Sequence, residues 1–261
     1  MNNFVIDRVV RGVALAQGAN ANLGIQAGDI LFSINQITNP SLSCTSESAD
    51  AVDAMGTPIA TFYRAKSAEF SAENALFDMN LMATQVGSKK VVASSSKVVL
   101  VPAFETVDVA ASATTATLAN TPKDTAAVKC YELNGDGTLG AKIDVTVSGT
   151  TATFAADSSN ERQLFFMYEW ESKGAENKGA IEVVNSAVNF PVGCKFIMEI
   201  LGADVCDQTN LVYAYLIFPN AKLSPDFDWS IATDSTHPFS MKAMQDYCDK
   251  EKKLFSIVIP E

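Results

Sequence analysis

Apolar and polar residues alternate with a period of two over much of the chain, which is the pattern of half-buried β-strands. The plainest case begins with an apolar run at 211–218 that ends at Pro219. The alternation then resumes, with three apolar residues on one face and three polar residues on the other: Phe227, Trp229 and Ile231 against Asp226, Asp228 and Ser230. We therefore predict two strands joined as a hairpin, followed by a third strand that contains Phe239, Met241 and Ala243.

One stretch has the periodicity of a helix. It follows a predicted strand at 58–72, and it is bounded by Asn74, a good N-cap residue, and by Gly87, a good C-terminal stop. Between them, apolar residues recur at spacings of three and four: Leu76, Met79, Met82 and Val86. The spacing predicts one short helix over 75–86 that packs an apolar stripe against the sheet.

The composition changes near residue 97. From there to about 177 the chain is rich in Val, Thr, Ala and Ser, and six or seven short strands are separated by turns that contain Gly and Asn. This pattern predicts an inserted immunoglobulin-like β-sandwich over 97–177, with Trp170 in its core. Residues 1–96 and 178–261 share the longer-strand pattern, so we expect them to form one discontinuous β domain.

A polar segment precedes the strand at 58–72. Residues 38–57 are dominated by Ser, Thr, Asp and Glu. Such a composition favours a strand edge that passes into a long exposed loop, of a kind that becomes ordered on binding a neighbour.

Charge and length exclude several classes of function. The chain has 261 residues and a net charge of −11, and it has no basic stripe interleaved with aromatic residues. Because nucleic-acid affinity comes mostly from Lys and Arg that neutralise phosphates, specific nucleic-acid binding is not expected. No apolar run approaches the roughly 20 residues that a membrane-spanning helix needs, and we expect no signal peptide.

Candidate chemistry is sparse. A catalytic triad would need His237, the single histidine, yet no nucleophile motif accompanies it, and we interpret it as a structural residue in a polar turn. Asp226 and Asp228 would form a carboxylate pair, but alternating Asp on a wet strand face is usually solvated surface. The Asn-Gly-Asp-Gly sequence at 134–137 lacks the rest of a calcium loop and predicts a hairpin turn.

The cysteines are five in number, and no two form a Cys-x-x-Cys pair: Cys44, Cys130, Cys194, Cys206 and Cys248. We interpret them as buried or free thiols of a protein made in a reducing cytoplasm. We predict no catalytic residue, no cofactor and no metal, and therefore no enzyme.

Three stretches together resemble the major tail tube proteins of long-tailed bacteriophages. They are the polar segment, strand and helix at 46–88, the hairpin and strand at 218–244, and the immunoglobulin-like insert. The resemblance implies a mainly β fold: a tail-tube-like β-sandwich or split barrel with one short flanking helix, plus the inserted immunoglobulin-like β-sandwich.

The resemblance also implies a function. Subunits of this kind form hexameric rings that stack into a tube, contact other phage tail proteins, and enclose a channel through which DNA passes without specific binding. The protein would then reside in the virion tail after assembly in the host cytoplasm, with no membrane contact. The implied lumen-face residues are Asp226 and Asp228. The implied residues of the loop between rings are Thr45, Glu47, Asp50, Asp53 and Met55.

Two other functions stay open at this point. One is another virion component, such as a head decoration or tail terminator protein, and the other is a non-enzymatic surface binding module. Concentration-dependent polymerisation would distinguish the tube subunit from the binding module.

Overall fold

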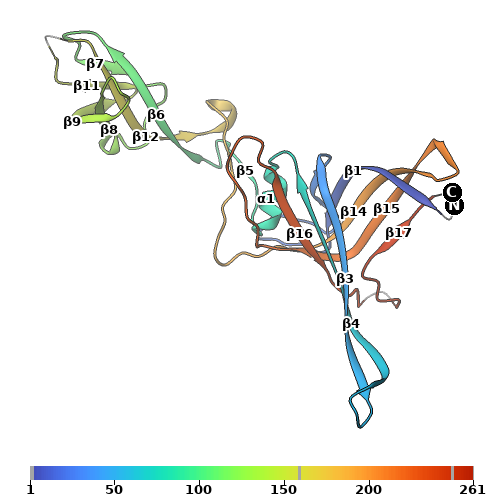
Figure 1. Cartoon of the computed structure of the whole chain (residues 1–261). Coiled ribbons are helices and arrows are strands. Elements are labelled where there is room, and N and C mark those ends of the chain that lie inside the picture. The colour runs from blue at the N-terminus through green and yellow to red at the C-terminus, as the bar shows by residue number, and fades with distance from the viewer. Residues whose placement is uncertain (1–2, 158–159, 248–249, 261) are drawn as a thin grey trace. The chain divides into compact units, whose positions relative to one another are not determined.

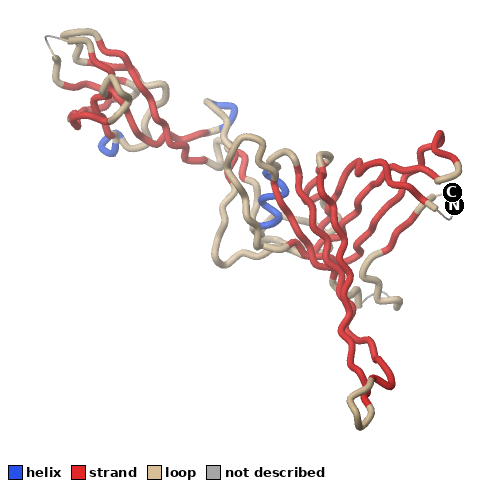
Figure 2. The backbone as a smooth tube through the Cα atoms, in the orientation of Figure 1, coloured by secondary structure: helices blue, strands red, loops and turns tan. Residues whose placement is uncertain are grey.

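The computed structural model describes residues 3–157, 160–247 and 250–260 of the chain. Strands make up 56% of the chain and helices 5%, which confirms the predicted mainly β fold. The chain divides into two compact units, and each is described by itself. Met1–Lys90 and Val183–Glu261 form the larger unit, and Val91–Glu182 forms the smaller one (Figures 1 and 2).

The larger unit is built on an antiparallel sheet of eight strands. The strand order is β2-β1-β14-β15-β16-β4-β3, and β17 pairs with β15. The elements are β1 (Phe4–Ala16), β2 (Ile30–Ile34), β3 (Ile37–Val52), β4 (Pro58–Asn74), α1 (Met79–Gln85), β14 (Gly193–Asp204), β15 (Asp207–Leu223), β16 (His237–Ala243) and β17 (Ser256–Val258).

This sheet bends over on itself and encloses a core of phenylalanine rings. In a flat sheet β2 and β16 would lie about 19 Å apart, because four strand spacings of about 4.8 Å separate them. The ring centroids of Phe32 on β2 and Phe239 on β16 are instead 6.4 Å apart. Phe196 on β14 contacts both of these rings, and it also packs against Phe70 and Phe218 at centroid distances of 5.6 and 6.3 Å. All five rings are buried, so the sheet supplies most of its own core.

The third strand of the predicted C-terminal group is confirmed as β16. Its inward-facing residues are buried, as the alternation predicts: Phe239, Met241 and Ala243. The first strand, β15, differs from the prediction because it continues through Pro219 as far as Leu223. Proline lacks the N–H that a central strand must donate. It is accommodated here because β17 pairs with β15 only as far as Ile217 and β16 pairs with it only from Ala221.

The one α-helix among the described residues is shorter than predicted. It begins at Met79, and the carboxylate of the N-cap residue Asp78 accepts hydrogen bonds from the N–H groups of Asn80 and Leu81 at 2.9 and 2.7 Å. Gly87 follows its last turn with a φ of +64°, the left-handed conformation that ends many helices. The predicted stop is therefore confirmed.

The predicted helix start is wrong, and of the four residues in the predicted apolar stripe only Val86 is fully buried. Asn74 is the last residue of β4, where it pairs with both β3 and β16. Leu76 precedes the helix and is 63% exposed. The side chains that α1 buries are Leu81, Ala83, Thr84 and Gln85.

The smaller unit has two main sheets that enclose a separate core. Its strands are β5 (Val91–Val92), β6 (Val99–Val109), β7 (Thr115–Thr117), β8 (Lys129–Leu133), β9 (Leu139–Ile143), β10 (Val145–Ser148), β11 (Thr151–Phe154), β12 (Arg162–Ser172) and β13 (Ile181–Glu182), with short 3-10 turns at Thr125–Ala127 and Gly174–Glu176. The sheets have the orders β6-β12-β8-β9 and β10-β11-β7, and β5 pairs with β13 where the chain enters and leaves.

Trp170 lies in the core of the smaller unit, as predicted, and is 7% exposed. Nearby, the hydroxyl of Tyr168 donates a hydrogen bond to Glu105 and accepts one from the N–H of Asn120 at 3.1 Å. Burial, and then the bond to Glu105, raise the pKa of Tyr168 to about 12, so this phenol stays protonated. The description of the unit as immunoglobulin-like stays a prediction.

Candidate assembly surface

The long hairpin of β3 and β4 extends beyond the rest of the sheet as a two-stranded ribbon (Figure 1). Its strands pair from Thr45 and Ser67 out to Val52 and Pro58. We call residues 45–67 the ribbon. We predicted a loop for much of this segment, and that prediction is wrong, because the polar residues of β3 pair with β4 along its whole length.

The sequence of the tip explains why the ribbon turns where it does. The carboxylate of Asp53 accepts hydrogen bonds from the N–H groups of Met55 and Thr57 at 2.8 and 2.9 Å. Gly56 adopts a φ of +83°, which side chains disfavour. An Asp and a Gly at these positions close a tight turn, and they leave Met55 at the tip, 91% exposed.

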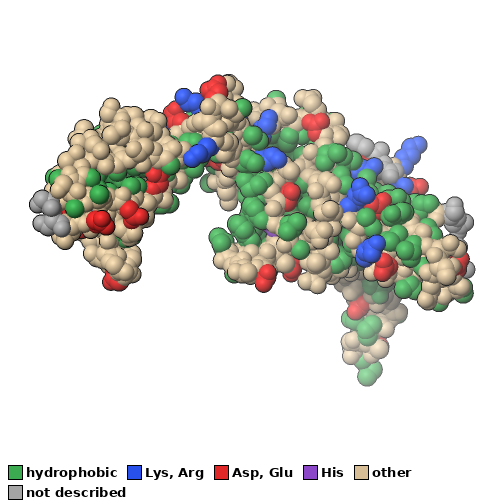
Figure 3. Space-filling model, turned by 90° about the horizontal axis from the view of Figure 1, so that it is seen from above, with side chains coloured by type: hydrophobic (Ala, Val, Ile, Leu, Met, Phe, Trp, Pro, Cys, Tyr) green, Lys and Arg blue, Asp and Glu red, His purple; other side chains and the backbone are tan. Residues whose placement is uncertain are grey.

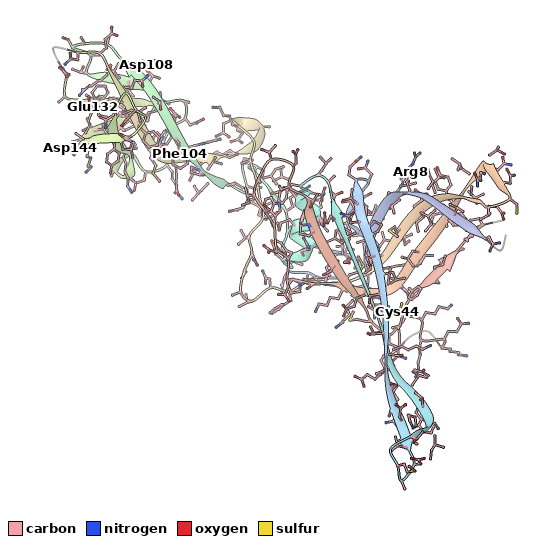
Figure 4. The ribbon with its side chains drawn as sticks, in the orientation of Figure 1. Arg8, Cys44, Phe104, Asp108, Glu132 and Asp144 are labelled. Atoms are coloured by element: carbon pink, nitrogen blue, oxygen red, sulfur yellow. The ribbon has the colours of Figure 1, made fainter. Side chains whose placement is uncertain are left out.

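Neither face of the ribbon is covered. Every side chain from 43 to 66 is exposed, and sticks project to both sides of the ribbon beyond Cys44 (Figure 4). The pairing of Ser48 with Tyr63 and of Ala49 with Phe62 places the two aromatic rings on opposite faces. The large apolar side chains that remain exposed are Val52 (55%), Met55 (91%), Ile59 (72%), Phe62 (56%) and Tyr63 (72%).

Such a ribbon needs a partner. A two-stranded hairpin is at best marginally stable in water by itself. Clustered exposed apolar side chains mark an interaction surface. The ribbon therefore has the properties of a segment that is buried against another molecule.

The sheet also offers open edges. Within the described residues, β2 pairs with β1 alone and β17 pairs with β15 alone. An unpaired strand edge presents N–H and C=O groups that another chain can extend. The larger unit thus combines a projecting apolar ribbon, in which β3 pairs with β4 alone, with the open edges of β2 and β17.

Comparison with known proteins agrees with this geometry. Residues 16–257 match the model of the YomU/Tube protein family, which is nearly the whole chain. The chain belongs to the YomU/Tube protein family. Membership indicates a phage tube-like structural protein that assembles with other tail components in the virion, and the family is not known for enzymatic activity. The comparison with curated proteins found no match.

The five predicted inter-ring residues of this YomU/Tube chain all lie on the ribbon. Thr45 is at its base, where its hydroxyl contacts that of Ser67 at 2.6 Å. Glu47 and Asp50 lie along β3, opposite Arg64 and Thr61, and Asp53 and Met55 form the turn. Their role between rings stays a prediction, but they share one projecting element.

The two predicted lumen residues lie elsewhere. Asp226 and Asp228 are exposed and belong to the connection between β15 and β16, where no strand forms, so the predicted strand over 226–231 is wrong. The alternation has another cause. Trp229 stacks on Phe77 with ring centroids 4.5 Å apart, and Phe227 packs near His237 at 6.4 Å, so these two side chains turn toward an aromatic cluster, whereas Ile231 is 85% exposed.

His237 is buried, contrary to the predicted polar turn, and is the first residue of β16. Only a trace of the single histidine shows in the space-filling view (Figure 3). Its Nε2 lies 2.7 Å from Oε1 of Gln85, and its ring stacks on Phe77 at 5.2 Å. Burial lowers the pKa of His237, against a smaller opposing effect of Asp78. These contacts give it a structural role within the core.

The remaining candidate chemistry is structural as well. The sequence at 134–137 forms the predicted β8–β9 turn: Asp136 accepts hydrogen bonds from Thr138, and these lower the pKa of its carboxyl. In the part of the chain that the structure describes, no three His, Cys, Asp or Glu side chains gather as a metal site. Nor is any described helix long and apolar enough to cross a membrane.

The described cysteines are free thiols. Cys44 and Cys206 are exposed, whereas Cys130 and Cys194 are buried. Burial raises the pKa of Cys130 to about 11 and that of Cys194 to about 12, so both are unreactive thiols at neutral pH. Cys248 lies outside the described residues.

Proposed function

We propose that this chain is the subunit of a phage tail tube. Copies join through their sheet edges into rings, expected to be hexameric, and the rings stack through the ribbon. The stacked rings enclose the channel through which DNA is ejected. The observation that carries the proposal is the ribbon, because its two uncovered apolar faces give a subunit of this family a reason to polymerise.

The strand edges support the ring contact. When β2 of one copy meets β17 of the next, both edges gain hydrogen-bonding partners and the sheet continues from subunit to subunit. A closed ring would pair every β2 and β17 edge, which removes the aggregation hazard that these two open edges pose for a monomer.

The charge of the chain supports the channel. With a net charge of −11, a wall made of many copies repels the DNA phosphates, so DNA slides past without binding. Asp226 and Asp228 are exposed and remain our candidates for the channel wall. Replacing both with Lys should slow DNA ejection, and unchanged ejection would remove them from that role.

The smaller unit is a separate addition to the tube. Its entry and exit strands, β5 and β13, pair with each other, so the unit is attached at one point. We propose that it is an immunoglobulin-like decoration over about 97–177 that lies outside the tube wall. Its removal should therefore leave polymerisation intact.

Recombinant protein tests the proposal. The wild-type chain should form hollow tubes above a critical concentration, as seen by sedimentation and electron microscopy. A matched variant replaces residues 46–66 with Asn-Gly, a turn that suits the Thr45–Ser67 pair. It removes no buried side chain, so its circular dichroism and unfolding should be unchanged while tubes are lost. Tubes formed equally well by this variant, or a wild type that never assembles, would contradict the proposal.

A further inference from the structure

A second uncovered surface of the larger unit lies on the side of the sheet opposite the core. Pairing aligns four serines in one row across β3, β4, β16 and the residue that follows β15: Ser41, Ser71, Ser240 and Ser224. The next row contains Ser43, Glu69, Lys242 and Lys222. We call these eight residues the serine trough.

The trough is hollow as well as uncovered. A cavity of about 500 Å³ lies over it, and its walls include Phe190, Pro191, Pro225 and Met244. A second hollow of about 220 Å³ continues from it and shares Ser71 and Ser240. Phe190 is 63% exposed, so apolar surface is available at the rim.

The small side chains of the serine row limit what kind of element can cover the trough. Sheets that pack face to face lie about 10 Å apart, and side chains must fill the space between them. Serine side chains fill little of that space, so the covering element has to bring large side chains of its own. A β-ribbon that carries an aromatic ring fits this requirement.

The charge of the trough indicates the chemistry of its occupant. Lys222 and Lys242 are directly opposite each other on neighbouring strands, an arrangement that destabilises the sheet when it is left uncompensated. Glu69 lies 3.0 Å from the amine of Lys242, whereas Lys222 forms no ion pair within the described part of the chain. An additional carboxylate from a partner would complete the charge balance.

One face of the ribbon carries both an aromatic ring and a carboxylate. The pairing of Asp50 with Thr61 and of Ser48 with Tyr63 places a carboxylate and an exposed aromatic ring on the same face. Asp53 in the turn adds a second carboxylate. The ribbon cannot reach the trough of its own chain, because it continues β3 and β4 away from the rows that form the trough (Figure 1).

We propose that the serine trough is the receptor for the ribbon of a second copy of this chain, with Tyr63 packed over the serines and Asp50 beside Lys222. This inference rests on the proposed function and identifies the surface on the neighbouring subunit that the ribbon binds. It makes polymerisation directional, since the ribbon and the trough are different surfaces and each copy carries one of each.

Charge exchange between the two surfaces tests the contact. Lys222→Glu and Asp50→Lys should each raise the critical concentration for tubes at least tenfold, and the double variant should return it to within about threefold of the wild type. Lys129→Glu is the control, because it makes the same charge change at an exposed site in the smaller unit. Ser71→Tyr fills the trough without changing charge and should also raise the critical concentration at least tenfold.

Two results would overturn the inference while leaving the proposed function standing. In the first, the wild type forms tubes and the ribbon-shortened variant does not, yet Lys222→Glu and Ser71→Tyr assemble like the wild type. In the second, both charge variants are impaired and the double variant is no better than either. Monomer circular dichroism and sedimentation confirm that each variant is folded before assembly is scored.

Discussion

Replacing the two aromatic residues of the ribbon with serine should weaken assembly without weakening the subunit. Burial of a large apolar side chain contributes about 1.5–3 kcal/mol. Phe62 is 56% exposed and Tyr63 is 72% exposed, so covering what remains exposed contributes about 1–2 kcal/mol for each. A change of 1.4 kcal/mol is roughly a tenfold change in an association constant. Phe62→Ser and Tyr63→Ser should therefore each raise the critical concentration for tubes roughly tenfold.

The double variant carries the sharper test. The two rings lie on opposite faces of the ribbon, so their contributions should add and the critical concentration should rise roughly a hundredfold. Light scattering across a dilution series measures that concentration. Urea unfolding of the monomer should change by no more than about 0.5 kcal/mol for either residue, because both are surface residues in the subunit. If only one face proves sensitive, or if stability falls with assembly, the account of a ribbon buried on both faces is wrong.

Three further predictions concern the subunit itself. Phe196→Ala removes a ring that contacts other buried rings in the core and should lower the free energy of unfolding by about 3–5 kcal/mol in urea titration; a loss below about 1 kcal/mol would argue against that core. Gly87→Ala should cost more than about 1 kcal/mol, since φ is +64° and the new Cβ would lie 2.2 Å from the carbonyl carbon of Phe190; an unchanged melting temperature would contradict this. His237 has a lowered folded pKa, so it is neutral in both states above its ordinary value of 6.5, and stability should fall below that pH as the unfolded chain alone takes up the proton. The slope of the free energy of unfolding against pH should reach at most about 1.4 kcal/mol per pH unit, and it should disappear in His237→Gln. An equal slope in the wild type and the variant would refute this prediction.

The core was predictable because it follows local alternation. Phe239, Met241 and Ala243 are two residues apart, and whichever strands flank β16, these three side chains share one face. The same holds for the end of the helix, where Gly87 alone supplies the left-handed conformation. These two predictions, the buried face of β16 and the glycine that ends the helix, were confirmed because each depends on a local preference that the fold also satisfies.

The ribbon was not predictable from composition. Residues 45–52 resemble a loop because Ser, Thr, Asp and Glu dominate, and only the pairing with β4 makes them a strand. The alternation around Phe227 and Trp229 also gave a wrong strand prediction, because these side chains turn inward and contact Phe77 and His237 rather than lying on one face of a sheet. In both cases, partners distant in the sequence decide the local structure.

The serine trough depends still more on distant partners. Ser41 and Ser224 are separated by most of the chain, and each serine alone reads as ordinary exposed surface. Their alignment arises from the register of β3, β4, β16 and β15, which no local pattern encodes. The predicted end of the strand at Pro219 was wrong for a related reason, since the gap between β17 and β16 that accommodates the proline exists only in the folded sheet.

The most direct test of the central claim is a cryo-electron microscopy map of the tail of a phage that carries this chain. The account predicts a shaft built of stacked rings of this chain, with the eight-stranded sheet in the wall around the channel and each ribbon reaching a neighbouring ring. A map that places the chain in the head or at one end of the tail only, with a different protein forming the shaft, would contradict it.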